Sequence, residues 1–131
     1  MEHDHLTYAV IGCAMEVHTF LGNGFQEVIY QRCLAIEMEK AGIPFQRELP
    51  QTIFYKEFKV GTRRADFIVE GTLVLELKAQ LQIEGSHLAQ VMNYVQAYNM
   101  DRGLLINFGA KSLGVKLIFS KEEKERWQLN K

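Results

Sequence analysis

The sequence predicts an α/β domain with a mixed central β-sheet flanked by helices. Amphipathic helical patterns occupy the start of the chain and return after residue 84. Between and after them lie short runs rich in Phe, Tyr, Ile and Val, which are typical of strands. The chain has 131 residues, of which 47% are hydrophobic and 24% charged. This length and composition predict one compact domain spanning residues 1–131.

Two helices are expected first. Apolar residues recur every three or four positions over residues 6–21, and Asp4 stands where an N-cap is needed. Gly22-Asn23-Gly24 ends this helix, because Gly and Asn tolerate the left-handed conformation at a helix terminus. A second helix is expected over residues 26–40. It ends at a segment with Gly at the stop and Pro just beyond, residues 41–44.

The period then changes to that of strands. Extended segments are expected at residues 45–55, 58–60, 64–69 and 73–79, with Pro50 interrupting the first. A third helix over residues 85–99 presents Leu88, Val91, Met92 and Val95 on one face. Strands at 104–108 and 115–119 precede a charged tail whose one large aromatic residue is Trp127. With the interrupted first hairpin counted as one unit, the order is α-α-β-β-β-α-β-β.

Bulk properties exclude several classes of protein. A formal net charge of -1 gives no support to a polybasic nucleic-acid binder, so any such contact needs a local basic patch. Cys13 and Cys33 lie within apolar helical patterns, and we expect both to be reduced core residues. No run approaches the ~18 apolar residues of a membrane span, and no basic segment of a signal peptide opens the chain. The expected location is the cytoplasm.

Charged residues interrupt the apolar stretch from Ala65 to Ala79. A three-residue turn at residues 70–72 would pair Val69 with Leu73 and therefore place Asp66 directly opposite Glu76. Two opposed carboxylates repel and normally destabilise a sheet. The arrangement makes sense if a cation lies between them. That cation is either Lys78, in a structural ion pair, or a divalent metal.

The metal alternative has a defined chemistry. Two carboxylates, the backbone carbonyl of Leu77 and several waters would suit octahedral Mg²⁺ or Mn²⁺. Lys78, two residues beyond Glu76, could orient or deprotonate an attacking water or stabilise charge on a phosphoryl oxygen. Without metal, the crowded carboxylates should have raised pKa values. The stability of the metal-free protein should then fall as the pH rises.

Three helix-borne residues could join this group. Glu27 precedes Tyr30 by three residues on the second helix, so both can point from one face; alternatively Glu27 is a first-turn acid that interacts with the helix dipole. Gln90 and Tyr94 are four residues apart on the third helix, off its core stripe. Alone, this pair would be read as an ordinary polar helix face.

These residues resemble those of a known family. The segment from Gly24 to Tyr30 matches the G-x-x-E-x-x-Y signature of the GxxExxY proteins, which belong to the PD-(D/E)XK nuclease-like superfamily. The resemblance covers nearly the whole chain. It also includes the Ala65-Asp66 strand, the segment from Glu76 to Ala79, the pair Gln90 and Tyr94, and the segment from Gly103 to Gly109.

The resemblance implies a restriction-endonuclease-like core with Asp66, Glu76 and Lys78 as the catalytic group. Glu27 would help to hold a metal or position the lysine. Gln90 and Tyr94 look like the Q-x-x-x-Y pair of RecB-like nucleases, which orients the lysine or the substrate phosphate. Asn23 replaces a proline expected in the family's loop, and no basic residue follows Lys116 directly. The second departure concerns substrate affinity only.

The predicted function is hydrolysis of phosphodiester bonds by a Mg²⁺- or Mn²⁺-dependent nuclease, with DNA as the first expected substrate. A second hypothesis is a catalytically inactive module that keeps the fold and binds nucleic acid or protein. A third is a nuclease directed at RNA or at branched structures, which would share the site. A homodimer would allow so small a domain to bind duplex substrate symmetrically.

Overall fold

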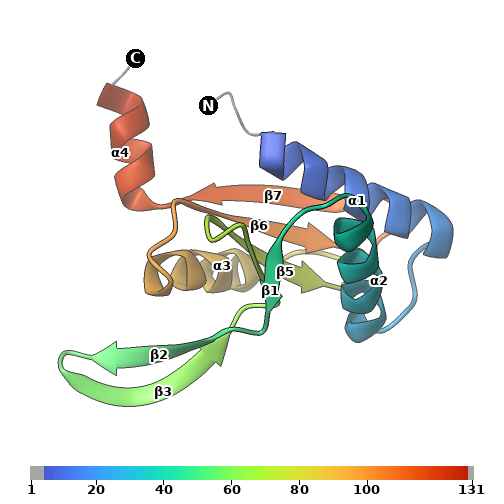
Figure 1. Cartoon of the computed structure of the whole chain (residues 1–131). Helices are drawn as coiled ribbons and strands as arrows, with labels where there is room; N and C mark the ends of the chain where they lie inside the picture. Colours follow the sequence, from blue (N-terminus) through green and yellow to red (C-terminus); the bar gives the residue numbers. More distant parts are fainter. Residues whose placement is uncertain (1–4, 130–131) are drawn as a thin grey trace.

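The computed structural model describes residues 5–129 and contains a five-stranded sheet of order β1-β4-β5-β6-β7. Its strands are β1 (Phe45–Arg47), β4 (Phe67–Val69), β5 (Leu73–Lys78), β6 (Arg102–Asn107) and β7 (Gly114–Phe119) (Figure 1). Strands β5 and β6 are parallel, with helix α3 (Gly85–Ala97) in the connection between them, and the other neighbours are antiparallel. The predicted mixed α/β sheet is therefore confirmed.

Helices cover the sheet on both faces. Side chains alternate along β5, so Leu73, Leu75 and Leu77 pack in one core cluster with buried residues of helices α1 (His5–Leu21) and α2 (Glu27–Lys40). Val74 belongs to a second cluster with Val91 and Val95 of α3. Glu76 shares the face of Val74 and is therefore directed toward α3. Cys13 and Cys33 are free thiols packed against the first cluster, as the sequence predicts.

The turn between β4 and β5 has the predicted register. Val69 pairs with Leu73, Ile68 with Val74 and Phe67 with Leu75. The chain reverses through Glu70 and Gly71, which have positive φ values of 49° and 66°. When this register is extended by one residue beyond Phe67 and Leu75, Asp66 lies opposite Glu76.

The segment before β4 differs from the prediction. It divides into β1, β2 (Pro50–Tyr55) and β3 (Phe58–Arg64), and β2 and β3 pair only with each other. They form a hairpin, here called the arm, that extends away from the body of the protein (Figure 1). The chain leaves β1 at Glu48, whose φ is 48°, and returns at Ala65 and Asp66, which separate β3 from β4. The predicted single strand over residues 64–69 is thus interrupted where the chain changes from one sheet to the other.

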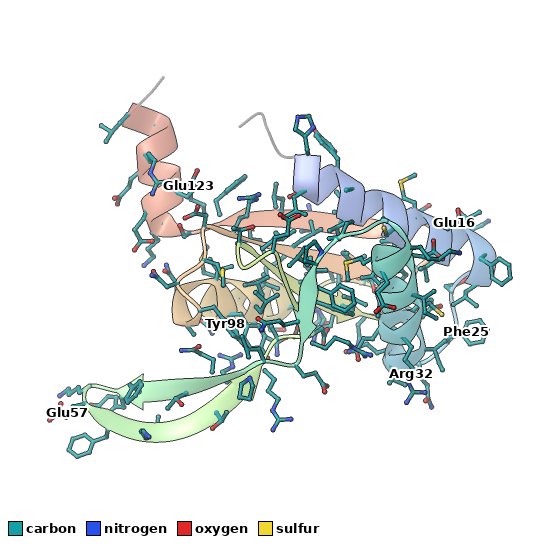
Figure 2. All side chains as sticks on the ribbon, in the orientation of Figure 1. Glu16, Phe25, Arg32, Glu57, Tyr98 and Glu123 are labelled. Atoms are coloured by element: carbon teal, nitrogen blue, oxygen red, sulfur yellow. The ribbon has the colours of Figure 1, made fainter. Side chains whose placement is uncertain are left out.

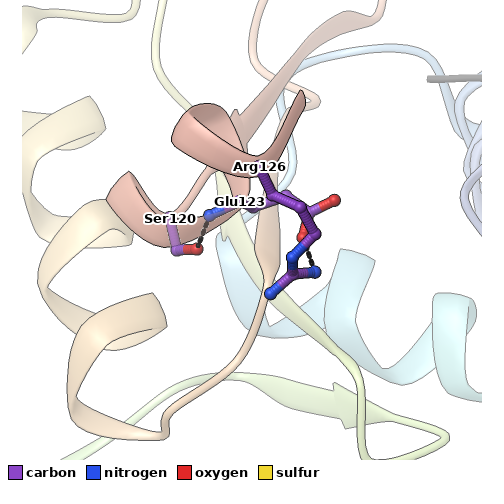
Figure 3. A network of polar contacts seen from close by, with 3 residues as sticks. All are labelled: Ser120, Glu123 and Arg126. Atoms are coloured by element: carbon purple, nitrogen blue, oxygen red, sulfur yellow. Dashed lines mark hydrogen bonds and ion pairs between the residues drawn. The ribbon is translucent and has the colours of Figure 1, made fainter. Parts of the chain in front are cut away.

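The charged tail is partly helical, which the sequence analysis missed. Helix α4 (Lys121–Leu129) begins after Ser120, whose Oγ accepts the backbone N–H of Glu123 at 3.0 Å (Figure 3). Arg126 Nη1 lies 2.5 Å from the Glu123 carboxylate. The signal was present as a Ser-x-x-Glu capping sequence, although the helix lacks an apolar stripe. The cap expected at Asp4 and the side chain of Trp127 lie outside what the structure describes.

The third helix ends two residues earlier than predicted. Helix α3 stops at Ala97, and Asn99 has a φ of 55°, a left-handed conformation that cannot continue a helix. Within residues 5–129, no helix has both the length and the apolar character that a membrane crossing would need.

Candidate functional site

Two carboxyl groups meet where the β4–β5 ladder ends. The backbone N–H of Asp66 donates to Glu76 Oε1 at 3.2 Å, and the backbone N–H of Leu77 donates to Asp66 Oδ2 at 2.7 Å. Asp66 lies one residue outside β4. Its backbone therefore bonds a side chain of β5, and its side chain bonds the backbone of β5, in place of the bonds of a regular ladder. Glu76 is only 5% exposed. The structure therefore brings together the two acids that the sequence places opposite each other.

The environment of this pair favours protonation. Burial raises the pKa of Glu76 from 4.5 to about 8, and the neighbouring Asp66 charge acts in the same direction. Burial also raises the pKa of Asp66, although its bond from the Leu77 N–H and the charge of Lys78 oppose the shift. In the metal-free protein at neutral pH, these shifts favour the protonated form of Glu76.

Helix α2 directs two side chains at this pair. Glu27 is half-buried, and its pKa is raised first by burial and then by the charge of Asp66, while Lys78 lowers it. Gln31, one helical turn further along, donates from Nε2 to Asp66 Oδ1 at 2.9 Å. The sequence analysis singled out Glu27 and missed Gln31. Its spacing of four residues from Glu27 was the signal that both share one helix face.

Lys78 ends β5 on the same strand as Glu76. Its positive charge opposes the upward pKa shifts of Asp66, Glu76 and Glu27, so Lys78 lies within electrostatic range of all three acids. Its carbonyl accepts the backbone N–H of Phe108 at 2.8 Å, which fixes this end of β5 to the end of β6.

Tyr94 lies under an arginine rather than on a separate polar helix face. It is 5% exposed and belongs to the core cluster of Val91 and Val95, which corrects its expected place off the core stripe. The physical reason is Arg63, whose guanidinium carbon lies 4.5 Å from the centre of the ring and screens it from water. Burial and the charge of Glu76 raise the pKa of Tyr94, whereas Arg63 opposes this shift. Tyr94 is thus within electrostatic range of the acid pair.

The other helix-borne residues have less defined surroundings. Gln90 is half-buried one turn before Tyr94, and no hydrogen bond of its side chain is found within residues 5–129. Met92, predicted for the core face of α3, is not a member of the second core cluster. Tyr94 therefore has a defined place in the second core cluster, whereas the role expected of Gln90 stays a prediction.

A second tyrosine, Tyr98, directly follows α3 and joins the site to the arm; the sequence analysis missed it. The Tyr98 hydroxyl donates to the Leu49 carbonyl and accepts the backbone N–H of Ala65 at 3.1 Å. Leu49 precedes β2 and Ala65 follows β3, so one side chain ties both strands of the arm at their base. Figure 2 shows Tyr98 between α3 and this base. Its position four residues after Tyr94 was the signal available in the sequence.

The tyrosine of the G-x-x-E-x-x-Y segment has a structural part. Tyr30 is fully buried, stacks on Phe108 with ring centres 4.6 Å apart, and donates from its hydroxyl to the Gly22 carbonyl at 2.6 Å. The same hydroxyl accepts the backbone N–H of Phe25 at 3.3 Å. These contacts hold the loop before α2 and so set the position of Glu27. In the same loop Asn23, which replaces the expected proline, donates to the Gly109 carbonyl at 3.4 Å.

A buried amide fixes the segment that follows Lys78. Asn107 is 4% exposed and bonds both backbone groups of Gln80, with its oxygen 2.9 Å from the amide nitrogen and its nitrogen 2.8 Å from the carbonyl. Gly109 lies against the same segment, where a Cβ would come within 2.3 Å of the Ala79 carbonyl carbon and the Gln80 nitrogen. A side chain at residue 109 would therefore displace the backbone next to Lys78.

The donor set fits a divalent cation only in part. Asp66 and Glu76 offer oxygen ligands. Burial raises the pKa values of both, and the charge of Asp66 adds to the shift of Glu76, so a cation bound between them would favour their ionised forms. Across the described residues, no three His, Cys, Asp or Glu side chains gather closely enough to hold one ion. Burial, and after it the charge of Asp66, raise the pKa of Glu27 at the start of α2. The expected role of Glu27 as a metal ligand stays a prediction, as does that of the Leu77 carbonyl.

The mixed sheet carries Glu76 and Lys78 on β5 and has Asp66 directly before the neighbouring strand β4. This arrangement is that of a restriction-endonuclease-like fold. The family model of the PD-(D/E)XK nuclease superfamily matches residues 4–118, and the chain belongs to this superfamily.

A solved structure supports the fold independently. The crystal structure of SSO0001 matches with a TM-score of 0.59 at 17% sequence identity. The match covers 79% of this chain and 55% of that chain, so this chain spans about half the length of that protein. At this identity the likeness concerns the fold alone. The comparison with curated proteins gave no match.

Proposed function

We propose that residues 1–131 form a single nuclease domain that hydrolyses phosphodiester bonds of nucleic acid with the help of Mg²⁺ or Mn²⁺. The observation that carries the proposal is the juxtaposition of two acids at one end of the β4–β5 ladder, where the Asp66 N–H bonds Glu76 Oε1 at 3.2 Å and Lys78 follows Glu76 by two residues. Burial and the charge of Asp66 disfavour the ionised form of Glu76, a cost that a bound cation would offset. Membership in the nuclease superfamily supports the same chemistry.

Asp66 and Glu76 are the residues that would hold the ion, with the Leu77 carbonyl as a further oxygen ligand. When bound, the ion supplies Lewis acidity and makes water a stronger acid. Gln31 and the Leu77 N–H orient the Asp66 carboxylate from two sides. Each carboxylate oxygen has two lone pairs, so both oxygens keep the capacity to bind a cation.

Lys78 and Tyr94 would act on the phosphate. In-line attack of water on phosphorus increases the negative charge on the phosphoryl oxygens, and an ammonium group near them stabilises that charge. Tyr94, with Gln90 one turn before it, lies on the α3 side of Glu76 and would position the lysine or the scissile phosphate. DNA is the first substrate to test, and RNA or branched DNA would use the same groups.

The test begins with calorimetric titration of Mn²⁺ into the wild type and into the Asp66→Asn/Glu76→Gln variant. We expect binding that the variant loses, followed by cleavage of one or more of single-stranded DNA, duplex DNA, branched DNA and RNA that the variant also lacks. The matched control is Glu16→Gln/Glu39→Gln, which removes two acids exposed on α1 and α2. It should behave like the wild type.

The inactive binding module predicts a different result. If the wild type binds neither Mn²⁺ alone nor Mn²⁺ with an oligonucleotide, and cleaves none of the substrates, the nuclease proposal is wrong. The acid pair would then be a remnant, and the amide variant should be at least as stable as the wild type.

A further inference from the structure

The arm exposes aromatic side chains at its free end. Phe54, Tyr55 and Phe58 are 55%, 62% and 62% exposed. Tyr55 pairs with Phe58 across the hairpin and Phe54 pairs with Lys59, so the aromatic rings occupy both faces beside the turn. Large exposed apolar groups on a projecting hairpin favour aggregation unless they serve binding.

The arm is also locally basic. Residues 50–64 contain the basic residues Lys56, Lys59, Arg63 and Arg64 and the single acidic residue Glu57, whereas the whole chain has a net charge of -1. Figure 2 places Glu57 at the tip. Aromatic rings interleaved with cations match a polyanion that carries flat bases.

The base of the arm leads directly to the acid pair. Arg63 lies over Tyr94, which the charge of Glu76 reaches. A groove of about 430 Å³ runs between the arm and α3, lined by Gln51, Thr52, Ile53, Phe54, Arg63, Asn93, Gln96 and Ala97. This groove connects the residues next to Tyr94 with the first exposed ring of the arm.

We propose that the arm binds an unpaired strand of the nucleic-acid substrate and leads it to Asp66 and Glu76. Phe54, Tyr55 and Phe58 stack on bases, and Lys59 and Arg64 contact phosphates. Bases in a duplex are already stacked on one another, so rings on a projecting hairpin gain most from single strands. From Arg63 to Phe58 the arm is ~17 Å long at about 3.3 Å per residue. This inference rests on the proposed function, because it names the substrate class of that site.

The test is fluorescence anisotropy with fluorescein-labelled oligo(dT) of about 20 nucleotides, which exceeds the ~4–16 nucleotides that a single OB-fold covers. A duplex of the same length is measured in parallel, and EDTA prevents cleavage. The arm variant is Phe54→Ala/Tyr55→Ala/Phe58→Ala. The control is Tyr8→Ala/Phe20→Ala, which removes exposed rings of α1.

We expect the wild type and the control to bind the single strand more tightly than the duplex. The arm variant should lose about tenfold or more in affinity for the single strand, because one stacked base contributes roughly that factor. Its affinity for the duplex should change little. Circular dichroism should show that the arm variant is folded, since the removed side chains are exposed.

A second variant tests the binding of phosphates without touching the rings. The affinity falls as the salt concentration rises. In Lys59→Gln/Arg64→Gln, the slope of log affinity against log salt should become less negative by about 0.7 for each phosphate that the variant no longer neutralises. Both variants keep Asp66, Glu76 and Lys78, so Mn²⁺ binding should equal that of the wild type.

The outcomes separate this inference from the proposed function. If the arm variant binds oligo(dT) as well as the wild type, or if the wild type does not bind it, the inference is wrong even if duplex is cleaved. If the arm binds oligo(dT) but nothing is cleaved with Mn²⁺, the binding of single strands by the arm is supported, and both the nuclease proposal and the delivery of the strand to Asp66 and Glu76 are wrong. If light scattering shows that the arm variant turns a dimer into a monomer with unchanged oligo(dT) affinity, the rings serve a second copy of the chain and the inference is overturned.

Discussion

Replacing Glu76 with glutamine should remove most of the pH dependence of folding stability in the metal-free protein. Burial first, and then the charge of Asp66, raise the pKa of Glu76 from 4.5 to about 8 in the folded state. At about 1.36 kcal/mol for each unit of pKa, this difference bounds the effect at about 5 kcal/mol. The folded state holds the proton more tightly than the unfolded chain. Stability is therefore highest below pH 4.5 and is lost as the pH rises to about 8.

The Glu76→Gln side chain is uncharged at every pH. Its oxygen can accept the Asp66 N–H as Glu76 Oε1 does, and its nitrogen can donate to the Asp66 carboxylate. Urea unfolding followed by circular dichroism, in EDTA at intervals from about pH 5 to pH 8, should give similar stabilities at the acidic end. At the basic end the variant should be more stable by several kcal/mol, up to the bound of about 5.

Two further measurements sharpen this test. The Glu16→Gln variant, which neutralises an exposed acid, should give a curve parallel to that of the wild type. Mn²⁺ at about pH 8 should stabilise the wild type and leave Glu76→Gln nearly unchanged, because binding to the folded state adds to its stability. A wild-type curve that is flat over this range, or a variant with the wild-type slope, would refute the reasoning.

Three other substitutions test the hydrogen bonds around the site. Tyr98→Phe removes both hydrogen bonds of the hydroxyl and should lower the free energy of unfolding in urea by about 1–3 kcal/mol. Asn107→Ala leaves two backbone groups of Gln80 without their partner; it should cost a similar ~1–3 kcal/mol and accelerate hydrogen exchange at the Gln80 amide. Gln31→Ala removes a donor to Asp66 and should weaken Mn²⁺ binding about tenfold in calorimetry, the usual effect of losing a partner of a metal ligand.

Exposed residues of the same type provide the controls. Tyr8→Phe should leave stability unchanged, and Gln46→Ala should leave Mn²⁺ affinity unchanged, because both side chains are exposed. Equal effects of Tyr98→Phe and Tyr8→Phe would contradict the role of the Tyr98 hydroxyl. Unaltered hydrogen exchange in Asn107→Ala, or full Mn²⁺ affinity in Gln31→Ala, would contradict the other two assignments.

The opposition of Asp66 and Glu76 could be predicted because it depends on local information. The three-residue turn from Glu70 to Thr72 determines which residues pair, and the alternation of side chains along each strand determines the face on which they lie. Helices α1, α2 and α3 could be predicted for the same reason, since each segment contains its own apolar period, whereas α4 has no apolar stripe and was missed.

The residues that surround the pair depend on contacts between distant segments. Gln31 meets Asp66 across 35 residues of sequence, and Tyr98 meets Leu49 across 49. Their spacing from Glu27 and Tyr94 indicates the side on which each one lies, but no local pattern identifies the distant partner that it bonds. The detachment of the arm from the main sheet was also hidden, because β2 and β3 have the composition of ordinary sheet strands.

The attachment of the arm makes it a modular part. The Tyr98 hydroxyl bonds the Leu49 carbonyl before β2 and the Ala65 N–H after β3, so it anchors both ends of the hairpin. Ala65 directly precedes Asp66. Changes in length or sequence near Lys56 and Glu57 would be absorbed beyond this anchor. The outer half of the hairpin could therefore be replaced by a different hairpin sequence, in evolution or by protein engineering, without a change in the position of Asp66 and Glu76.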